Sequence, residues 1–129
     1  MSKSIFEKIA DRELPSYTIW EDEKHMAFLT IAPIAKAHTL VIPKKNLHDH
    51  IFDLTDEDYI ELQLAAKKVA KLLQLKTASD RVISWTEGFE VPHVHIHLVP
   101  VNKGFQFADA KPQMAEQDNL KAVHASLTD

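Results

Sequence analysis

Three histidines alternate with aliphatic residues in the segment HVHIHLVP, residues 93–100. If this segment is a strand, His93, His95 and His97 lie on one face, because successive side chains of a strand point to opposite faces. The intervening aliphatic residues then lie on the other face, where they can pack against a helix. Three hydrogen-bonded histidines with a purely structural role are the alternative, but burying three imidazoles for structure alone is costly. The alternation therefore predicts a ligand site on the histidine face.

Imidazole can bind a metal ion or attack an electrophile, and the spacing helps to separate these roles. A rise of ~3.3 Å per residue places alternate strand residues ~6.6 Å apart, so an ion with ligands at ~2.1 Å cannot reach all three histidines of a straight strand. With an unperturbed pKa of ~6.5, His95 is largely neutral and nucleophilic at neutral pH. Its attack on phosphorus would give a phosphoramidate, with His93 and His97 as donors to the non-bridging oxygens. A sheet metalloprotein without this chemistry is the alternative hypothesis.

The elements that must position these histidines form a mixed pattern, which is typical of an α+β domain on a mostly antiparallel sheet. Alternation and β-branched content predict strands at residues 17–21, 26–30, 38–42, 81–86 and 93–99. A short helix is expected at residues 5–10 and a weak one at residues 113–127.

The clearest helix begins after Thr55, because Thr55 and Asp58 have the spacing of a capping box. Apolar residues then recur at spacings of three and four and predict one buried stripe, made of Tyr59, Leu62, Ala66, Val69 and Leu73. We expect this stripe to pack against the aliphatic face of the histidine strand.

Composition bounds the classes of function. With 129 residues and 45% hydrophobic content, the chain is long enough for one compact domain, with a core at residues 1–102 and a polar tail at residues 103–129. A net charge of −4 argues against nucleic-acid binding, and no apolar run approaches the ~18 residues of a membrane helix. The N-terminal segment lacks a secretory signal pattern and the chain has no cysteine, so we expect a cytoplasmic protein without disulfides or thiolate metal sites.

Three segments together resemble the histidine triad (HIT) superfamily, in its Hint-like bacterial branch. HVHIHLV (residues 93–99) fits the family signature His-φ-His-φ-His-φ-φ, where φ is hydrophobic. AHTLVIPKK (residues 37–45) resembles the second hallmark of the family, and residues 4–31 resemble its N-terminal block. The resemblance implies a HIT-like fold, which is a mostly antiparallel sheet of about five strands with one long helix and a short N-terminal helix. It also implies a homodimer with a continuous sheet across both subunits.

The same resemblance implies an activity. The expected protein is a nucleotide-binding hydrolase or transferase that cleaves nucleoside 5′-monophosphate conjugates, such as phosphoramidates or dinucleotides, through a covalent nucleotidyl-histidine intermediate. No cofactor is implied, and the expected partner is a purine nucleotide or its conjugate. A nucleotide-binding regulatory or scaffold protein with weak or vestigial catalysis is the alternative.

Matched position by position, the resemblance makes His95 the nucleophile, His93 and His97 the flanking triad members, and His38 the histidine that opens the HTLVIP strand. The positions that clamp the nucleobase in the family are occupied here by Phe6, Ile9, Phe28 and Ile31. From the sequence alone these four apolar residues would be assigned to an ordinary core.

Several positions depart from the pattern of the family. Thr30 stands where many relatives have an aspartate that binds the ribose hydroxyls, and a neutral hydroxyl should bind ribose more weakly. Ser84 lies near the usual asparagine, and Phe89-Glu90 replaces a common Gln-Ser or Gln-Thr pair before the triad. Glu90 is therefore the candidate for protonating the leaving group in place of a hydroxyl, with a solvated surface carboxylate as the alternative.

Many bacterial relatives also bind zinc through a C-x-x-C pair, a histidine after the IPKK stretch and a triad histidine. Here Ser4, Glu7 and Asn46 occupy the first three of these positions, so we expect no structural zinc. His48 and His50 lie nearby and are expected to be loop residues.

Overall fold

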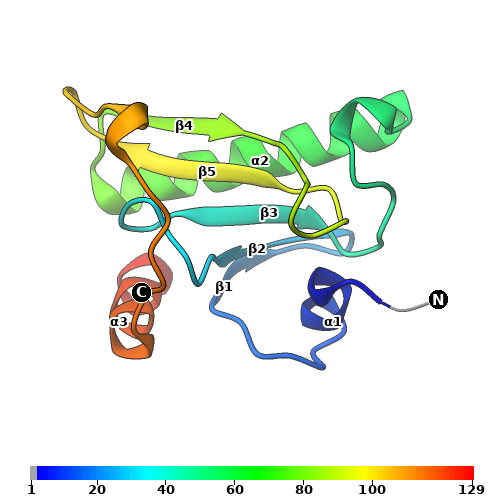
Figure 1. The fold of residues 1–129 in the computed structure, drawn as a ribbon, viewed down its shortest axis with the longest axis horizontal. Helices are drawn as coiled ribbons and strands as arrows, with labels where there is room; N and C mark the ends of the chain where they lie inside the picture. The colour runs from blue at the N-terminus through cyan, green and yellow to red at the C-terminus, as the bar shows by residue number, and fades with distance from the viewer. Residues whose placement is uncertain (1–2) are drawn as a thin grey trace.

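A sheet of five antiparallel strands lies at the centre of the computed structural model, which describes residues 3–129. The strands follow the order β1-β2-β3-β5-β4, and every neighbouring pair is antiparallel (Figure 1). Their bounds are β1 Thr18–Glu21, β2 His25–Leu29, β3 Thr39–Pro43, β4 Arg81–Trp85 and β5 Ile96–Val101. The sheet confirms the predicted α+β class, and four of the five strands start within one residue of their predicted positions.

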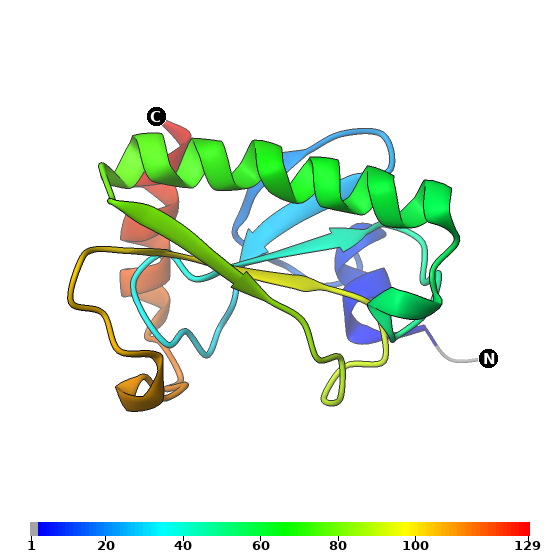
Figure 2. The ribbon, with the colours of Figure 1, turned by 90° about the horizontal axis from the view of Figure 1, so that it is seen from above.

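Helices cover both faces of this sheet. Their bounds are α1 Ile5–Ala10, α2 Asp56–Thr77 and α3 Gln117–Thr128, with short 3-10 turns η1 at Ile51–Asp53 and η2 at Phe107–Asp109. The long helix α2 runs along one face, whereas α1 and the segment that leads to α3 lie towards the other (Figure 2). Within residues 3–129, no helix combines the length and the apolar content needed to cross a bilayer.

One core joins α2 to the aliphatic side of the histidine segment. Leu62, Ala66, Val69 and Leu73 of α2 are buried in the same cluster as Val94, Ile96 and Leu98. The helix begins where expected, because the Thr55 hydroxyl accepts a hydrogen bond from the Asp58 N–H at 3.1 Å. Each fully buried aliphatic side chain contributes ~1.5–3 kcal/mol relative to an exposed one, so apolar packing stabilises the contact between α2 and this face.

A second, smaller core occupies the opposite face of the sheet. Phe6 of α1 packs there with Met26, Phe28, Leu40 and Ile42 of β2 and β3. The position of α1 is fixed by a complete capping box, in which the Ser4 hydroxyl and the Glu7 carboxylate each accept a backbone N–H of the other residue. This arrangement places α1 against the face that carries the histidines.

The histidine segment is only partly a strand, which corrects the prediction of a strand at residues 93–99. Pairing of β3 with β5 stops at Val41 and Ile96. If pairing continued, Pro43 would lie opposite Val94, but proline has no N–H to donate. Instead the Val94 N–H donates to the His48 carbonyl at 2.7 Å, and His93 and His95 lie in an extended segment before β5. In the tail, α3 starts at Gln117, later than the predicted residue 113.

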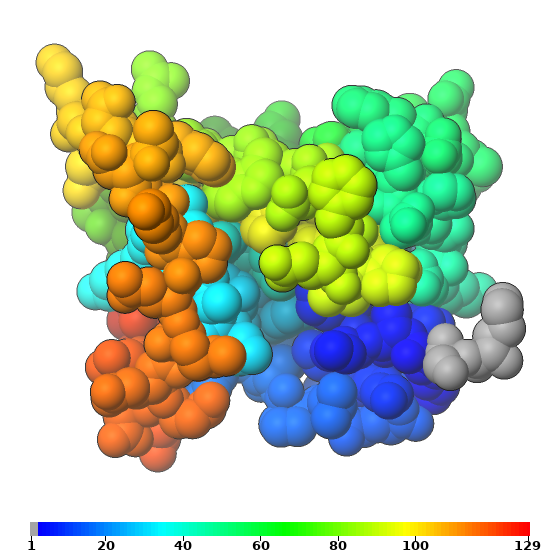
Figure 3. All heavy atoms as spheres, viewed as in Figure 1, coloured from blue at the N-terminus to red at the C-terminus, as the bar shows by residue number. Residues whose placement is uncertain are grey.

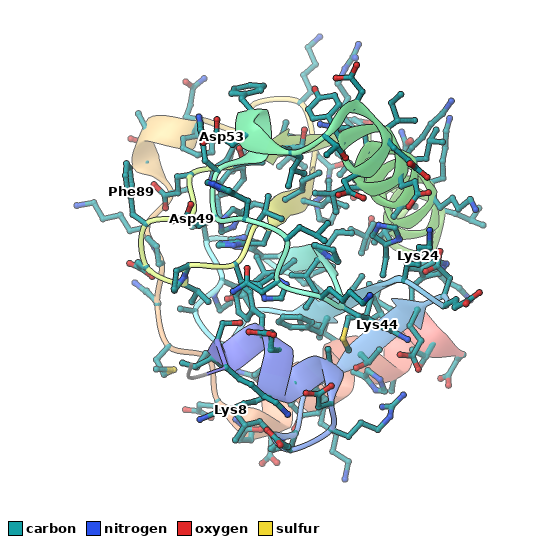
Figure 4. The ribbon with its side chains drawn as sticks, turned by 90° about the vertical axis from the view of Figure 1, so that its right-hand side faces the viewer. Lys8, Lys24, Lys44, Asp49, Asp53 and Phe89 are labelled. Carbon is teal, nitrogen blue, oxygen red and sulfur yellow. The ribbon has the colours of Figure 1, made fainter. Side chains whose placement is uncertain are left out.

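The loop of residues 86–92, between β4 and the histidine segment, packs tightly against the loop that follows β3. Gly88 has a φ of +80°, and a Cβ built on it would collide with the backbone carbonyl oxygen of Asp49. The Asn46 carboxamide donates to the Pro92 carbonyl at 3.0 Å. Figure 4 shows Asp49 close to Phe89, whose ring points outward and is 90% exposed.

Candidate active site

A cavity of about 690 Å³ opens on the face of the sheet opposite α2. It is lined by Phe6 and Ile9 of α1, by Phe28 of β2, by Thr30 and Ile31, and by Glu90, His95 and His97. The structure thus brings eight of the eleven predicted site residues to one pocket. Figure 3 shows three segments that are distant in sequence on this face: the N-terminal segment (blue), the 86–92 loop (yellow-green) and the C-terminal segment (orange).

The other three predicted residues lie outside the lining of this pocket. His93 is fully buried, and His38 is hydrogen-bonded to His97 and lines a neighbouring cavity. Ser84 is paired with Leu98 across β4 and β5, and residues directly opposite one another share a face of the sheet. Because Leu98 packs in the core with α2, Ser84 is on the wrong face to reach His95, which corrects its assignment to the catalytic group.

His95 is held by a backbone hydrogen bond. Its Nδ1–H donates to the carbonyl oxygen of His93 at 2.8 Å, and the edge of the Phe6 ring packs against the imidazole with the ring centroids 4.9 Å apart. A carbonyl oxygen can only accept, so Nδ1 carries the proton and Nε2 keeps its lone pair. Burial lowers the pKa of His95, which keeps the ring neutral at neutral pH. These contacts leave the lone pair of Nε2 unused within the protein, and a nucleophile needs such a lone pair.

His38 and His97 form a directional pair. The Ile34 N–H donates to His38 Nδ1 at 3.0 Å, so in the neutral ring Nε2 carries the proton. This Nε2–H donates to His97 Nδ1 at 2.9 Å, which in turn places the proton of His97 on its own Nε2. Burial lowers the pKa of His38 to about 4 and that of His97 to about 3, so both rings are neutral. One backbone amide therefore fixes the tautomer of both histidines.

His97 Nε2 is buried without a hydrogen-bond partner, and it is the one such side-chain atom in the part of the chain that the structure describes. Leaving a buried donor unpaired costs ~1–3 kcal/mol. The ring stacks on Trp85 with the centroids 4.6 Å apart and the planes at 2°, and it lies 5.0 Å from the His95 ring. The unpaired N–H thus belongs to a ring that is stacked on Trp85 and lies beside His95, and an acceptor on a ligand would satisfy it.

His93 differs because both of its ring nitrogens have protein partners. Nε2–H donates to the Pro43 carbonyl at 2.7 Å, and Nδ1 accepts from the Ser4 hydroxyl at 2.8 Å. Burial lowers its pKa, against the opposing effect of the Pro43 carbonyl. His93 therefore ties β3 to α1, and its own carbonyl orients His95.

Several residues in or beside the pocket were not predicted from the sequence. Trp85 was assigned only to a strand, yet its register opposite His97 creates the stacked pair. Glu87 lines the pocket beside Glu90, and both carboxylates raise the pKa of His95 against the larger effect of burial. Tyr17 and Gln117 also line it, although they are 100 residues apart. These contacts have no local signature, because they depend on strand register and chain return.

The positions that would hold zinc in relatives are used here for hydrogen bonds. Ser4 bonds to His93, and the Asn46 side chain donates to the Pro92 carbonyl. Among residues 3–129, no three His, Cys, Asp or Glu side chains converge as metal ligands. His48 and His50 lie in a loop, as predicted.

Comparisons with known proteins point to one family. Residues 11–104 match the family model of the HIT domain. Adenosine 5′-monophosphoramidase from Saccharomyces cerevisiae is 37% identical over 129 aligned residues, which cover 95% of this chain and 79% of that protein. An uncharacterized HIT-like protein from Borreliella burgdorferi is 31% identical and covers 99% of this chain and 98% of its own length.

Solved structures share the fold over almost the whole chain. A HIT-like protein from Bartonella henselae, described as involved in cell-cycle regulation, has a TM-score of 0.81 at 28% identity, covering 98% of this chain and 94% of that one. A hypothetical histidine triad nucleotide-binding protein from Sulfolobus tokodaii has a TM-score of 0.79 at 28% identity, covering 95% and 88%.

Proposed function

The chain belongs to the histidine triad (HIT) family, and we propose that it hydrolyses nucleoside 5′-monophosphate conjugates with His95 as the nucleophile. One observation carries this proposal: the unprotonated Nε2 of His95 lies in the same pocket as the ring of His97, whose buried N–H has no hydrogen-bond partner. A phosphoryl group would use both features, because its phosphorus can accept attack by His95 while one of its oxygens accepts the N–H of His97. The yeast relative named as a phosphoramidase supports a phosphoramidate as the substrate class.

The reaction has two steps. The His95 Nε2 lone pair attacks phosphorus, a P–N bond to the ring forms, and the P–N or P–O bond to the leaving group breaks. The leaving group departs with a proton, and the nucleotidyl-histidine remains. Water then attacks phosphorus and gives one proton back to the group that protonated the leaving group, the bond to His95 breaks, and a nucleoside monophosphate is released. The His97 N–H donates to a non-bridging oxygen, where charge is stabilised during both steps.

The leaving group needs a proton donor, and Glu90 is our candidate. Its side chain lines the pocket with His95, whereas the Ser84 hydroxyl does not. A poor leaving group such as an alkylamine needs protonation, but a nitrophenolate does not. Glu90→Gln should therefore slow cleavage of an alkylamine conjugate far more than that of a nitrophenyl ester. If Glu90→Gln slows the cleavage of both substrates equally, or slows neither, Glu90 is not the proton donor and is a surface carboxylate.

The remainder of the pocket suits a purine nucleoside. Phe6, Phe28 and Ile31 present apolar walls next to the histidines, with Ile9 and Thr30 beside them. Flat aromatic bases gain affinity from such walls through apolar burial and edge or face contacts. We propose that the base lies against these side chains and that Thr30 replaces a carboxylate as a weaker contact to ribose.

We also propose that two copies associate through β4. This strand forms one edge of the sheet, so one side of its backbone is unpaired within the described chain. Pairing with the same strand of a twofold-related copy would cover the β4 edge of each copy and create one continuous sheet. Light scattering should give twice the mass of the chain at micromolar concentration, and a monomer there would refute this assembly.

A second candidate is a nucleotide-binding regulatory protein with slow catalysis. It is favoured by one observation, namely that Ser84 is turned away from the pocket and cannot supply a hydroxyl to the leaving group. In this case the pocket would bind a nucleotide and turnover would be incidental.

Trapping the intermediate tests both candidates. Rapid quenching with a nucleoside phosphoramidate should give a mass increase of one nucleotidyl group on the peptide that contains His95. His95→Ala should abolish turnover while nucleotide binding persists, because the contacts to the nucleoside lie elsewhere in the pocket. Turnover within a few-fold of the wild type in pure His95→Ala would disprove the mechanism. Binding without any adduct or turnover in the wild type would favour the regulatory protein.

A further inference from the structure

The C-terminal tail forms part of the pocket wall. Met114 and Gln117 line the same cavity as His95 and His97, although the match to the HIT domain ends at residue 104. The tail crosses this face of the molecule and can be followed in orange in Figure 3. The segment outside the family match therefore contributes to the site.

This tail is fixed in place by hydrogen bonds along its length. The Ala115 N–H donates to the Ile31 carbonyl at 2.8 Å, and the Gln113 N–H donates to the Pro33 carbonyl at 3.2 Å. Further on, the His124 ring bonds through Nε2 to the Thr18 carbonyl at 2.9 Å. These contacts tie the tail to the loop after β2 and to β1, so the wall is built before any ligand binds.

Gln117 is oriented by Tyr17, a neighbouring side chain that also lines the pocket. The Tyr17 hydroxyl donates to Gln117 Oε1 at 2.9 Å. A carboxamide has two N–H donors and two acceptor lone pairs, so this bond leaves both donors and one lone pair for a ligand. The neighbouring walls made by Phe6, Phe28 and Ile31 are apolar and supply burial without direction. Gln117 adds a polar group of fixed orientation to them.

We propose that the Gln117 carboxamide, held by Tyr17, hydrogen-bonds the nucleoside part of the substrate and determines which nucleosides bind. This inference rests on the proposed function, since it takes the phosphate to lie at His95 and His97. A few well-placed polar groups in an apolar pocket fix ligand orientation and specificity. Gln117 would form this hydrogen bond with either the base or the ribose, because both carry hydrogen-bond donors and acceptors.

The chain contains a matched control. Gln113 belongs to the same tail, but it lines a neighbouring cavity of about 860 Å³ rather than the pocket that holds His95, and its hydrogen bond to Pro33 is made by its backbone N–H. Replacing either glutamine by leucine removes the same carboxamide. Only the Gln117 substitution removes a carboxamide from the pocket that holds His95.

The test is the affinity for adenosine 5′-monophosphate, measured by calorimetry on the full chain. Gln117→Leu should weaken binding about tenfold, which is the value of one net hydrogen bond. Gln113→Leu should stay within about twofold of the wild type, and Tyr17→Phe should weaken binding about threefold, because it only frees the orientation of Gln117. Equal affinities of the two leucine variants would overturn the inference.

Two modified nucleotides identify the atom that Gln117 contacts. If it bonds ribose, the penalty of Gln117→Leu should disappear with 2′-deoxyadenosine 5′-monophosphate. If it bonds the base, the penalty should disappear with purine riboside 5′-monophosphate, which lacks the exocyclic amine, or change with guanosine 5′-monophosphate. A wild type that binds none of these nucleotides would refute the proposed function itself. A wild type that binds them with no effect of Gln117→Leu refutes this inference alone.

Discussion

His93 and His97 lie on either side of His95 in sequence, and their surroundings differ in one respect. Both rings are neutral because burial lowers their pKa. Each nitrogen of His93 has a protein partner, whereas one nitrogen of His97 has none. The difference indicates that His93 completes the fold and that His97 is completed by a ligand. Under the proposed mechanism, the three histidines would thus divide into a structural member, a nucleophile and a donor.

The strongest test of this division removes the unpaired donor. His97→Phe keeps a ring that can stack on Trp85 but has no N–H, so kcat/KM should fall by about 10²–10³. His97→Gln should retain more activity, because a carboxamide can accept from His38 and still donate. Steady-state kinetics with one nucleoside phosphoramidate measure both variants. A His97→Phe enzyme with nearly wild-type turnover would place the oxyanion donor elsewhere.

Removal of His93 should instead affect folding. His93→Ala leaves the Ser4 O–H without its acceptor and the Pro43 carbonyl without its donor around a cavity, and we expect a loss of about 3 kcal/mol in the free energy of unfolding. Urea denaturation compares this loss with that of His97→Phe, which should be smaller. The division between the two histidines is wrong if His97→Phe proves the more destabilising.

The lowered pKa values of His38 and His97 should make the free energy of unfolding depend on pH. Unfolded histidine titrates near ~6.5, whereas in the folded protein the pKa is about 4 for His38 and about 3 for His97. Between these values the unfolded chain binds more protons, so the free energy of unfolding falls as the pH decreases from about 6.5 towards 4. Each histidine contributes up to ~1.4 kcal/mol per pH unit. Denaturation curves at several pH values should show a shallower slope for His97→Phe, and an unchanged slope would contradict the assignment.

The smallest expected effect concerns the hydroxyl that binds His93. Ser4→Ala removes both the N-cap of α1 and the bond to His93 Nδ1, and should cost about 1 kcal/mol of stability. Thr55→Ala removes a comparable cap from α2 and serves as the control. Only Ser4→Ala should shift the ¹⁵N resonance of His93 Nδ1. A shift of equal size in both variants would show that Ser4 does not orient the ring.

Much of the fold could be predicted because its signals are local. The spacing of Leu62, Val69 and Leu73 and the cap at Thr55 predicted α2 and its buried face, and the alternation at residues 93–99 separated aliphatic from histidine side chains. The predicted start of β5 was wrong, because the pairing of β5 with β3 stops before Pro43, a residue of the neighbouring strand.

The parts of the site that escaped prediction depend on contacts between distant segments. Ser4 meets His93 across 89 residues, and Tyr17 meets Gln117 across 100. Which face Ser84 occupies depends on the register of β4 against β5, which no short motif specifies. Residue types indicated the chemistry of the triad, but only the assembled sheet distinguished the roles of its members.

The collision that any Cβ at residue 88 would make with the Asp49 carbonyl has a practical consequence for engineering. Residues of the 86–92 loop line the pocket, so this loop is a suitable place to alter selectivity. A mutant library should keep glycine at position 88, where every other residue would displace the loop. Diversity then belongs at Glu87, Phe89 and Glu90, which are exposed and can change in size or charge without moving the backbone that carries them.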